Sequence, residues 1–227
     1  MTCTIISDSH QRHLELTKDL TTPTDIIIHS GDFMTSGYSV QEIYDFLDWY
    51  SVVGNYSNRI LVAGNHDRFC ENYPEKFAEI LKKYPSITYL ENSSVTIDGI
   101  KFYGSPYQPW FYNWAFNKQR GAEIAEEWAK IPNDVDVLVT HGPVYGYCDQ
   151  VNSRGEHLGC EELRKKVEEI KPLLSVSGHI HSGRTQNPMT NGYTVFLNAS
   201  NLDEQYRYAY PPILVEINKE EGKVIIK

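Results

Sequence analysis

Short runs rich in β-branched residues alternate with amphipathic stretches along this chain of 227 residues. This alternation is typical of an α/β protein, and a hairpin turn at Asp98-Gly99 indicates that the sheet is mixed. Strands are predicted at residues 3–6, 25–29, 59–62, 95–97, 100–103, 135–140, 173–177, 193–197, 212–217 and 223–226. Helices are predicted at residues 39–50, 74–84, 119–130 and 160–170.

Size and charge limit the classes of function. With 41% hydrophobic residues the chain can bury one substantial core, so we expect a single domain over residues 1–227. The formal net charge is -9, which argues against a nucleic acid polymer as partner but allows a small anionic substrate beside bound cations. The chain start resembles no signal peptide and no apolar run reaches about 18 residues, so we expect a cytoplasmic protein without a membrane contact.

Five of the predicted strands end in a glycine or another small residue followed by Asp, Asn or His. Open α/β sheets bind ligands beyond the carboxyl ends of their strands, so these side chains should lie close together. Any one of them alone would be an ordinary turn, helix cap or structural histidine, but that explanation does not cover five strand ends. The segments are Asp8-Ser9-His10, Gly31-Asp32, Gly64-Asn65-His66-Asp67, His141-Gly142 and Gly178-His179-Ile180-His181.

In this order the five segments resemble the signature of the calcineurin-like metallophosphoesterases, over nearly the whole chain. Residues 104–111, 140–143 and 195–200 are similar to the metallophosphoesterase-domain proteins related to class III cyclic nucleotide phosphodiesterases. The resemblance implies a four-layer α-β-β-α sandwich of two mixed sheets flanked by helices, with two divalent metal ions. It implies that one ion is held by Asp8, His10, Asp32 and His181, and the other by Asp32, Asn65, His141 and His179.

Imidazole, carboxylate and amide ligands without a thiolate suit Mn, Fe, Zn or Ni better than Ca, and we expect Mn to serve in vitro. Such a metal pair polarises phosphoryl oxygens and holds a bridging hydroxide, which would be the nucleophile. The resemblance makes His66 the group that protonates the leaving oxygen or stabilises the phosphoryl charge, with Asp67 orienting its ring. The alternative for His66 is a spacer beside the ligands.

The predicted activity is that of a phosphoesterase, and more narrowly of a phosphodiesterase on small nucleotides such as cyclic nucleotides. Two other functions are a non-catalytic binding scaffold on the same fold and a nuclease; the complete ligand set argues against the first and the acidic charge against the second. The aromatic segment 107–114 could instead be core, and Asn198 a plain strand-end turn. The predicted substrate contacts are Asn65, His66, Tyr107, Trp110 and Asn198.

Overall fold

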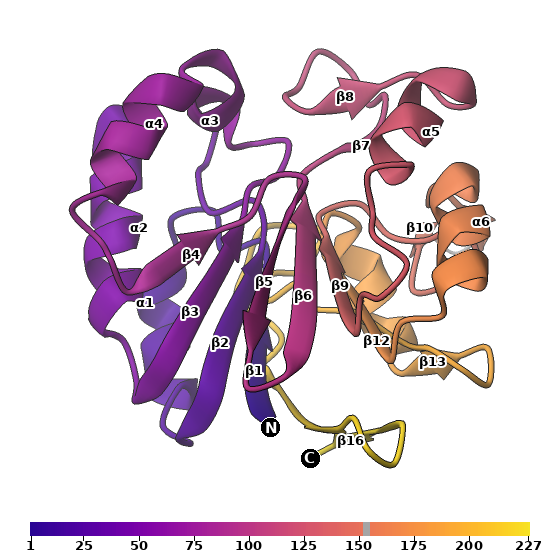
Figure 1. The fold of residues 1–227 in the computed structure, drawn as a ribbon. Coiled ribbons are helices and arrows are strands. Elements are labelled where there is room, and N and C mark those ends of the chain that lie inside the picture. Colours follow the sequence, from indigo (N-terminus) through magenta and orange to yellow (C-terminus); the bar gives the residue numbers. More distant parts are fainter. Residues whose placement is uncertain (152–154) are drawn as a thin grey trace.

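The computed structural model describes residues 1–151 and 155–227 and contains two six-stranded sheets (Figure 1). In the first sheet four strands run parallel, and two C-terminal strands extend it antiparallel. Its order is β16 (Lys223–Ile226), β15 (Ile213–Asn218), β1 (Thr2–Ile6), β2 (Thr24–Ser30), β3 (Tyr56–Val62) and β4 (Ile87–Tyr89).

The second sheet has a parallel centre and an antiparallel strand at each edge. Two small two-stranded sheets accompany it, one of β7 (Gln108–Pro109) with β8 (Asn117–Lys118) and one of β10 (Gln150–Val151) with β11 (Glu156–His157). The strand order of the second six-stranded sheet is β13 (Met189–Thr190), β14 (Val195–Asn198), β12 (Leu174–Ser177), β9 (Val137–Thr140), β6 (Ile100–Ser105) and β5 (Ser93–Ile97).

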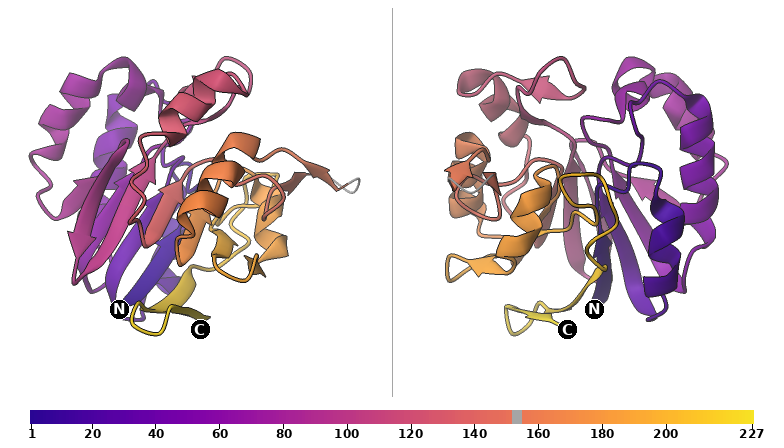
Figure 2. Two further views of the ribbon diagram at one scale, coloured as in Figure 1. Left: turned by 45° about the vertical axis from the view of Figure 1, so that its right-hand side comes forward. Right: turned by 180° about the vertical axis from the view of Figure 1, so that it is seen from behind.

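Helices cover the outer face of each sheet, as the two views of Figure 2 show. Helices from the first half of the chain lie on the first sheet, and two later helices lie on the second. The first set comprises α1 (His13–Leu16), the 3-10 helix η1 (Thr17–Asp19), α2 (Val40–Val52), α3 (Arg68–Asn72) and α4 (Pro74–Leu81). The second comprises α5 (Ala122–Trp128) and α6 (Glu161–Ile170), and a second 3-10 helix, η2 (His181–Gln186), follows β12.

Alternation along the strands explains the layers. In β1, Ile5 packs against the second sheet and Ile6 against the helices, because neighbouring strand residues point to opposite faces. The same holds for Ile27 and Ile28 in β2, so both faces of the first sheet are apolar. The predicted four-layer sandwich of two mixed sheets is confirmed. None of the described helices has the length and apolar character needed to cross a bilayer.

The predicted element bounds differ from the structure mainly at helix ends and in short elements. The helix expected over 119–130 begins at Ala122, because Gly121 adopts a φ of 84° that ends any helical run before it. The short elements α1, α3 and β4 were not predicted, since three to five residues show no measurable periodicity. The carboxyl ends of the parallel strands gather at one edge, opposite the two chain termini (Figure 1).

Candidate metal centre

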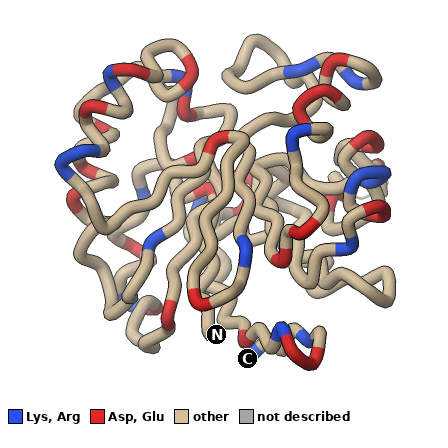
Figure 3. Tube along the Cα trace, in the orientation of Figure 1, with Lys and Arg blue, Asp and Glu red and all other residues tan. Residues whose placement is uncertain are grey.

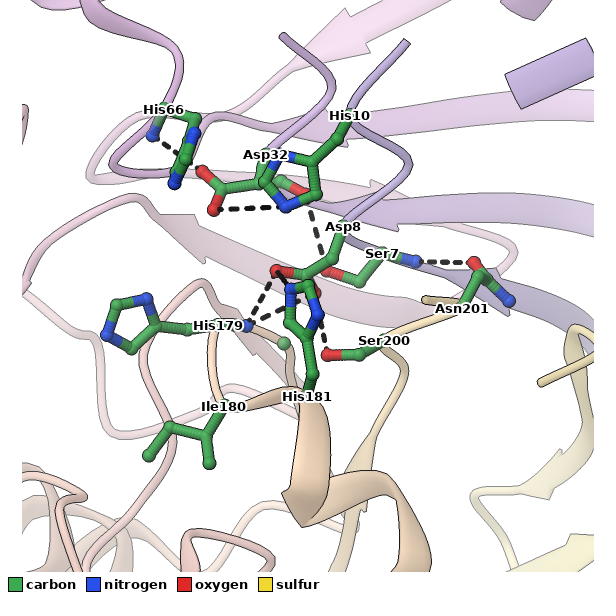
Figure 4. A network of polar contacts seen from close by, with 12 residues as sticks. Ser7, Asp8, His10, Asp32, His66, His179, Ile180, His181, Ser200 and Asn201 are labelled. Atoms are coloured by element: carbon green, nitrogen blue, oxygen red, sulfur yellow. Dashed lines mark hydrogen bonds and ion pairs between the residues drawn. The ribbon is translucent and has the colours of Figure 1, made fainter. Parts of the chain in front are cut away.

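The loops after β1, β2, β3, β9 and β12 meet where the two sheets approach each other, and Figure 4 shows part of this meeting point. Several predicted ligands have a left-handed backbone, which is uncommon for residues other than glycine. Strain of this kind persists only where the surroundings enforce it, and it is concentrated at functional sites. The strained ligands are Asp8 (φ 53°), His10 (φ 39°), Asp32 (φ 59°) and His179 (φ 65°).

The glycines before the ligands are required by close packing. A Cβ added at Gly178 would lie 2.2 Å from Oδ2 of Asp8, and one added at Gly31 would lie 2.3 Å from Nδ1 of His141. Gly31 also has a φ of 109°, a conformation that side-chain-bearing residues rarely adopt. The small residue and the ligand that follows it are therefore one structural unit.

Asp32 lies between His10 and His141 at the centre of the site, and Figure 4 shows it beside His10. Its Oδ2 is 3.8 Å from Nε2 of His10 and 3.2 Å from Nε2 of His141. Its Oδ1 accepts a hydrogen bond of 2.7 Å from the backbone N–H of His66. The carboxylate is thus fixed in a position from which it faces ligands on both sides.

The other six predicted metal ligands lie together around Asp32. Nε2 of His181 is 3.5 Å from Oδ1 of Asp8, and Oδ1 of Asn65 is 2.9 Å from Nε2 of His141. Within each of two groups of three residues, the candidate ligand atoms lie within 4.8 Å of one another. The groups are Asp8 with His10 and His181, and Asp32 with His141 and His179.

The histidine rings are oriented as metal ligands require. Three of them bond a backbone carbonyl through Nδ1, which places a proton on Nδ1 and turns Nε2 toward the centre. The buried Nε2 of His10 has no hydrogen-bond partner among the described residues, which is expected of a nitrogen that serves as a metal ligand. The pairs are His10 with Met34 (3.1 Å), His141 with Ser30 (3.0 Å) and His181 with Asp203 (2.8 Å).

Burial and neighbouring charges set the protonation of the site. Burial opposes ionisation of Asp32, but His141 and His66 hold its pKa well below the usual range. Burial lowers the pKa of His10 to about 4 and that of His179 to about 3. His141 and His181 differ: burial lowers their pKa values too, but the Asp32 carboxylate raises the pKa of His141 to about 9, and the Asp8 carboxylate raises the pKa of His181. Imidazole nitrogens and carboxylates bind divalent metals once their protons are released, so these residues fit such ions.

Asp8 is held by two of the predicted ligands and by Ser200, which the sequence analysis does not single out. Burial opposes its ionisation, but the ring of His181, whose Nε2 lies 3.5 Å from Oδ1 of Asp8, keeps its pKa below the usual range. The backbone N–H of His179 donates to both oxygens of Asp8, at 3.0 and 3.1 Å, and the hydroxyl of Ser200 donates to Oδ2 at 2.8 Å. Ser200 lies two residues after the end of β14, so the strand-end pattern used for the other loops could have identified it.

The role expected of Asp67 requires a correction. Its carboxylate accepts three backbone hydrogen bonds, from Asp32 (2.9 Å), Met34 (2.8 Å) and Gly64 (2.7 Å), and does not contact the His66 ring. Asp67 therefore ties the loop after β2 to the loop after β3. Sequence spacing could not show this, because two of the three partners are backbone groups on another loop.

His66 is oriented by other residues. Its Nδ1 bonds the carbonyl of Thr35, and its ring stacks on Trp114 with the centroids 4.0 Å apart and 22° between the planes. His66 also lies close to His10 and Asp32. One candidate ligand atom from each of these three residues lies within 4.8 Å of the other two. The imidazole thus faces the centre while its Nδ1 is occupied.

A cavity of about 470 Å³ opens above the ligands. Asn65, His66 and Trp110, three of the predicted substrate contacts, line it, and Trp110 is 54% exposed. Two further aromatic side chains, Phe111 and Tyr206, also line the cavity. Phe111 lies in the predicted aromatic segment, whereas no sequence pattern indicates Tyr206.

The other two predicted substrate contacts lie elsewhere. Tyr107 packs edge-on against Phe116, with the ring centroids 5.6 Å apart. Asn198 is fully buried, and its amide donates to the carbonyls of Gly178 (3.0 Å) and Ile180 (2.8 Å). Neither side chain is among the described residues that line the cavity. Asn198 therefore supports the loop that carries His179.

Comparisons with known proteins agree with this geometry. The model of the calcineurin-like phosphoesterase family matches residues 1–183. The metallophosphoesterase domain-containing protein 1 of Homo sapiens is 36% identical, with 93% of this chain and 69% of that protein covered. Among solved structures, TT1561 of Thermus thermophilus has a TM-score of 0.66 at 13% identity, covering 100% of this chain and 97% of that one. An archaeal phosphodiesterase has a TM-score of 0.52 at 17% identity, with both chains covered completely.

Proposed function

Because the chain belongs to the calcineurin-like phosphoesterase family of metal-dependent phosphoester hydrolases, we propose that it is a two-metal phosphodiesterase for small nucleotides such as cyclic nucleotides. The observation that carries the proposal is the buried Asp32 carboxylate between His10 and His141. A carboxylate in this position can serve two ions at once.

Each ion would have its own set of ligands. Asp8, His10 and His181 would hold one ion, His141, His179 and Asn65 the other, and Asp32 would serve both. Bound divalent ions supply Lewis-acid polarisation of the phosphoryl oxygens and a water of lowered pKa. Imidazole and carboxylate ligands favour Mn, Fe, Zn or Ni, and Mn is the ion for tests in vitro.

His66 would supply the proton for the leaving group. Its Nδ1 is engaged with the carbonyl of Thr35, so Nε2 is the atom that remains for a substrate in the cavity. A protonated His66 would donate from Nε2 to the ester oxygen as its bond to phosphorus breaks. The stack on Trp114 would keep the ring in place during this step.

The charge of the cavity wall favours a diester over a monoester. A phosphomonoester carries a charge of about -1.5 to -2 at pH 7, whereas a diester carries about -1. Arg120 is the one lysine or arginine among the described lining residues, and Glu204 lines the same cavity. Arg120 already forms an ion pair with Glu161 and donates to the carbonyl of Leu158, so the wall offers little free positive charge for a dianion.

Aromatic side chains favour a nucleotide. Trp110 and Phe111 are 54% and 41% exposed, and Phe111 meets the ring of His179 edge-on at 5.6 Å. Exposed aromatic rings stack nucleobases, and a cavity of about 470 Å³ is of the size that holds a small ligand. Lys and Arg are interspersed with Asp and Glu around the described molecule, with no basic track for a polymer (Figure 3).

The proposal is tested by turnover of bis-p-nitrophenyl phosphate, p-nitrophenyl phosphate and a panel of cyclic and linear nucleotides. The protein is stripped with a chelator and reloaded with Mn, and the stripped protein is the control. We expect Mn-dependent turnover with a higher kcat/KM for the diester than for the monoester. A preference for the monoester would contradict the diester assignment, and no metal-dependent turnover of either would contradict hydrolase activity altogether.

A further inference from the structure

The loop between β14 and β15 carries an aromatic residue in a strained conformation. Tyr206 has a φ of 58°, in the left-handed region that bulky residues avoid. A tight turn enforces it: the N–H of Tyr206 donates to the carbonyl of Asp203 at 2.9 Å, and the Asp203 carboxylate accepts from the N–H groups of Gln205 and Arg207 at 2.9 Å each. Strain that is held in this way is a reason to look for a function.

The turn is also anchored to the rest of the site. Arg12, in the loop after β1, donates from its guanidinium to the carbonyl of Tyr206 at 2.7 Å. Nδ1 of the predicted ligand His181 bonds the carbonyl of Asp203 at 2.8 Å. The same turn thus orients one metal ligand and determines where Tyr206 lies.

The ring of Tyr206 lies against three histidines of the centre. Its centroid is 4.9 Å from that of His10, 5.2 Å from that of His181 and 6.3 Å from that of His66. The side chain lines the cavity and the residue is 46% exposed. Tyr208, two residues later, turns its hydroxyl to Asp19 at the surface, whereas the hydroxyl of Tyr206 has no hydrogen-bond partner within the described ranges.

The position of Tyr206 offers the cavity a neutral hydrogen-bond donor, its hydroxyl. Arg120, the one lysine or arginine among the described lining residues, is engaged with Glu161, so a side-chain contact to the substrate phosphate must come from another residue. A phenol is neutral at pH 7 and donates one hydrogen bond. We propose that Tyr206 is a substrate-positioning residue whose hydroxyl donates a hydrogen bond to a phosphoryl oxygen on the side of His10 and His181. This inference rests on the proposed phosphoesterase function.

The test compares Tyr206→Phe, which keeps the ring and removes only the hydroxyl, with wild type, both loaded with Mn. One hydrogen bond to a charged group corresponds to roughly a 10- to 100-fold change, so kcat/KM for the preferred ester should fall by that factor. The dissociation constant of inorganic phosphate, measured by calorimetry, should rise in the same range. Metal content by elemental analysis and the Tm should stay at wild-type values.

Tyr193→Phe is the matched control, because Tyr193 is exposed beside Lys171 at the turn before β14 and is not a described cavity residue. It should leave every readout unchanged. The inference is overturned if Tyr206→Phe matches wild type in kcat/KM and phosphate affinity, or if its metal content falls, because the residue would then support the ligands. If wild type hydrolyses no ester, the proposed function fails, while phosphate binding still decides the role of Tyr206.

Discussion

The indole of Trp114 stacks on the imidazole of His66, with the ring centroids 4.0 Å apart and 22° between the planes. The guanidinium of Arg68 lies over the same indole, 4.7 Å from its centroid. Together with the carbonyl of Thr35, this stack fixes the orientation of a ring that faces the cavity. Orientation of a proton donor affects rate directly, because a small misplacement costs about 100-fold.

We therefore expect Trp114→Ala to lower kcat by about 10- to 100-fold and to leave the metal content unchanged. Trp114→Phe keeps an aromatic face and should recover part of the loss. The measurement is steady-state turnover of the Mn-loaded variants with elemental analysis of the same samples. Equal kcat values for wild type and Trp114→Ala would show that the stack has no part in catalysis.

Removal of the imidazole itself should have a larger effect. His66→Ala should lower kcat by about 10²- to 10⁴-fold, the usual contribution of a positioned general acid, with wild-type metal content. The loss should be smaller for an ester that releases p-nitrophenolate than for one that releases an alkoxide, since the better leaving group needs less protonation. An equal loss on both esters, or a lost ion, would exclude the general-acid role.

Asp67 should affect the metal more than the chemical step. Asp67→Ala removes three hydrogen bonds, each worth about 1 kcal/mol, and two of them join the loops after β2 and β3. Because Asp32 lies in one of these loops and Asn65 in the other, Mn affinity should fall about 10- to 100-fold and the Tm should decrease. Titration with Mn and thermal unfolding measure both, and Asp134→Ala, at an exposed ion pair with Lys101, is the control. If the variant instead loses only kcat, the result would support the expected role of Asp67 in orienting the His66 ring.

His29 makes the stability of the metal-free protein depend on pH. The ring is fully buried, bonds Ser9 through Nε2 (3.0 Å) and accepts the N–H of Gly31 at Nδ1 (3.2 Å), and burial lowers its pKa to about 3. Between pH 6.5 and 3 the unfolded chain binds a proton that the folded chain does not, so stability falls with decreasing pH by at most about 1.4 kcal/mol per unit.

In urea unfolding with EDTA, we expect wild type to lose about 2 kcal/mol more than His29→Gln between pH 7 and pH 5. The other histidines contribute equally to both proteins, so they cancel in the comparison. Parallel stability curves for the two proteins over this range would mean that His29 titrates normally in the fold.

Much of the fold and centre could be predicted because strand ends combine two signals, an apolar run and the polar residues after it. Parallel strands bring such ends to one edge, which is why Asp8, Asp32 and His141 lie together although 133 positions separate the first and last. The position of Tyr206 depends on a turn held by contacts with distant loops, and local patterns do not record such contacts. Asn198 shows a second limit of sequence patterns. Its position at a strand end indicates a polar role, but it does not show that the amide donates to the carbonyls of Gly178 and Ile180 and not to a substrate.

The central claim, two ions that share Asp32, is tested most directly by anomalous diffraction from crystals of the Mn-loaded protein at the manganese edge. We predict two peaks, one among Asp8, His10 and His181 and the other among Asn65, His141 and His179, with the Asp32 carboxylate between them. Crystals of Asp32→Ala should lose at least one peak. A single peak in the wild type, or two peaks of which neither contacts Asp32, would contradict the shared site.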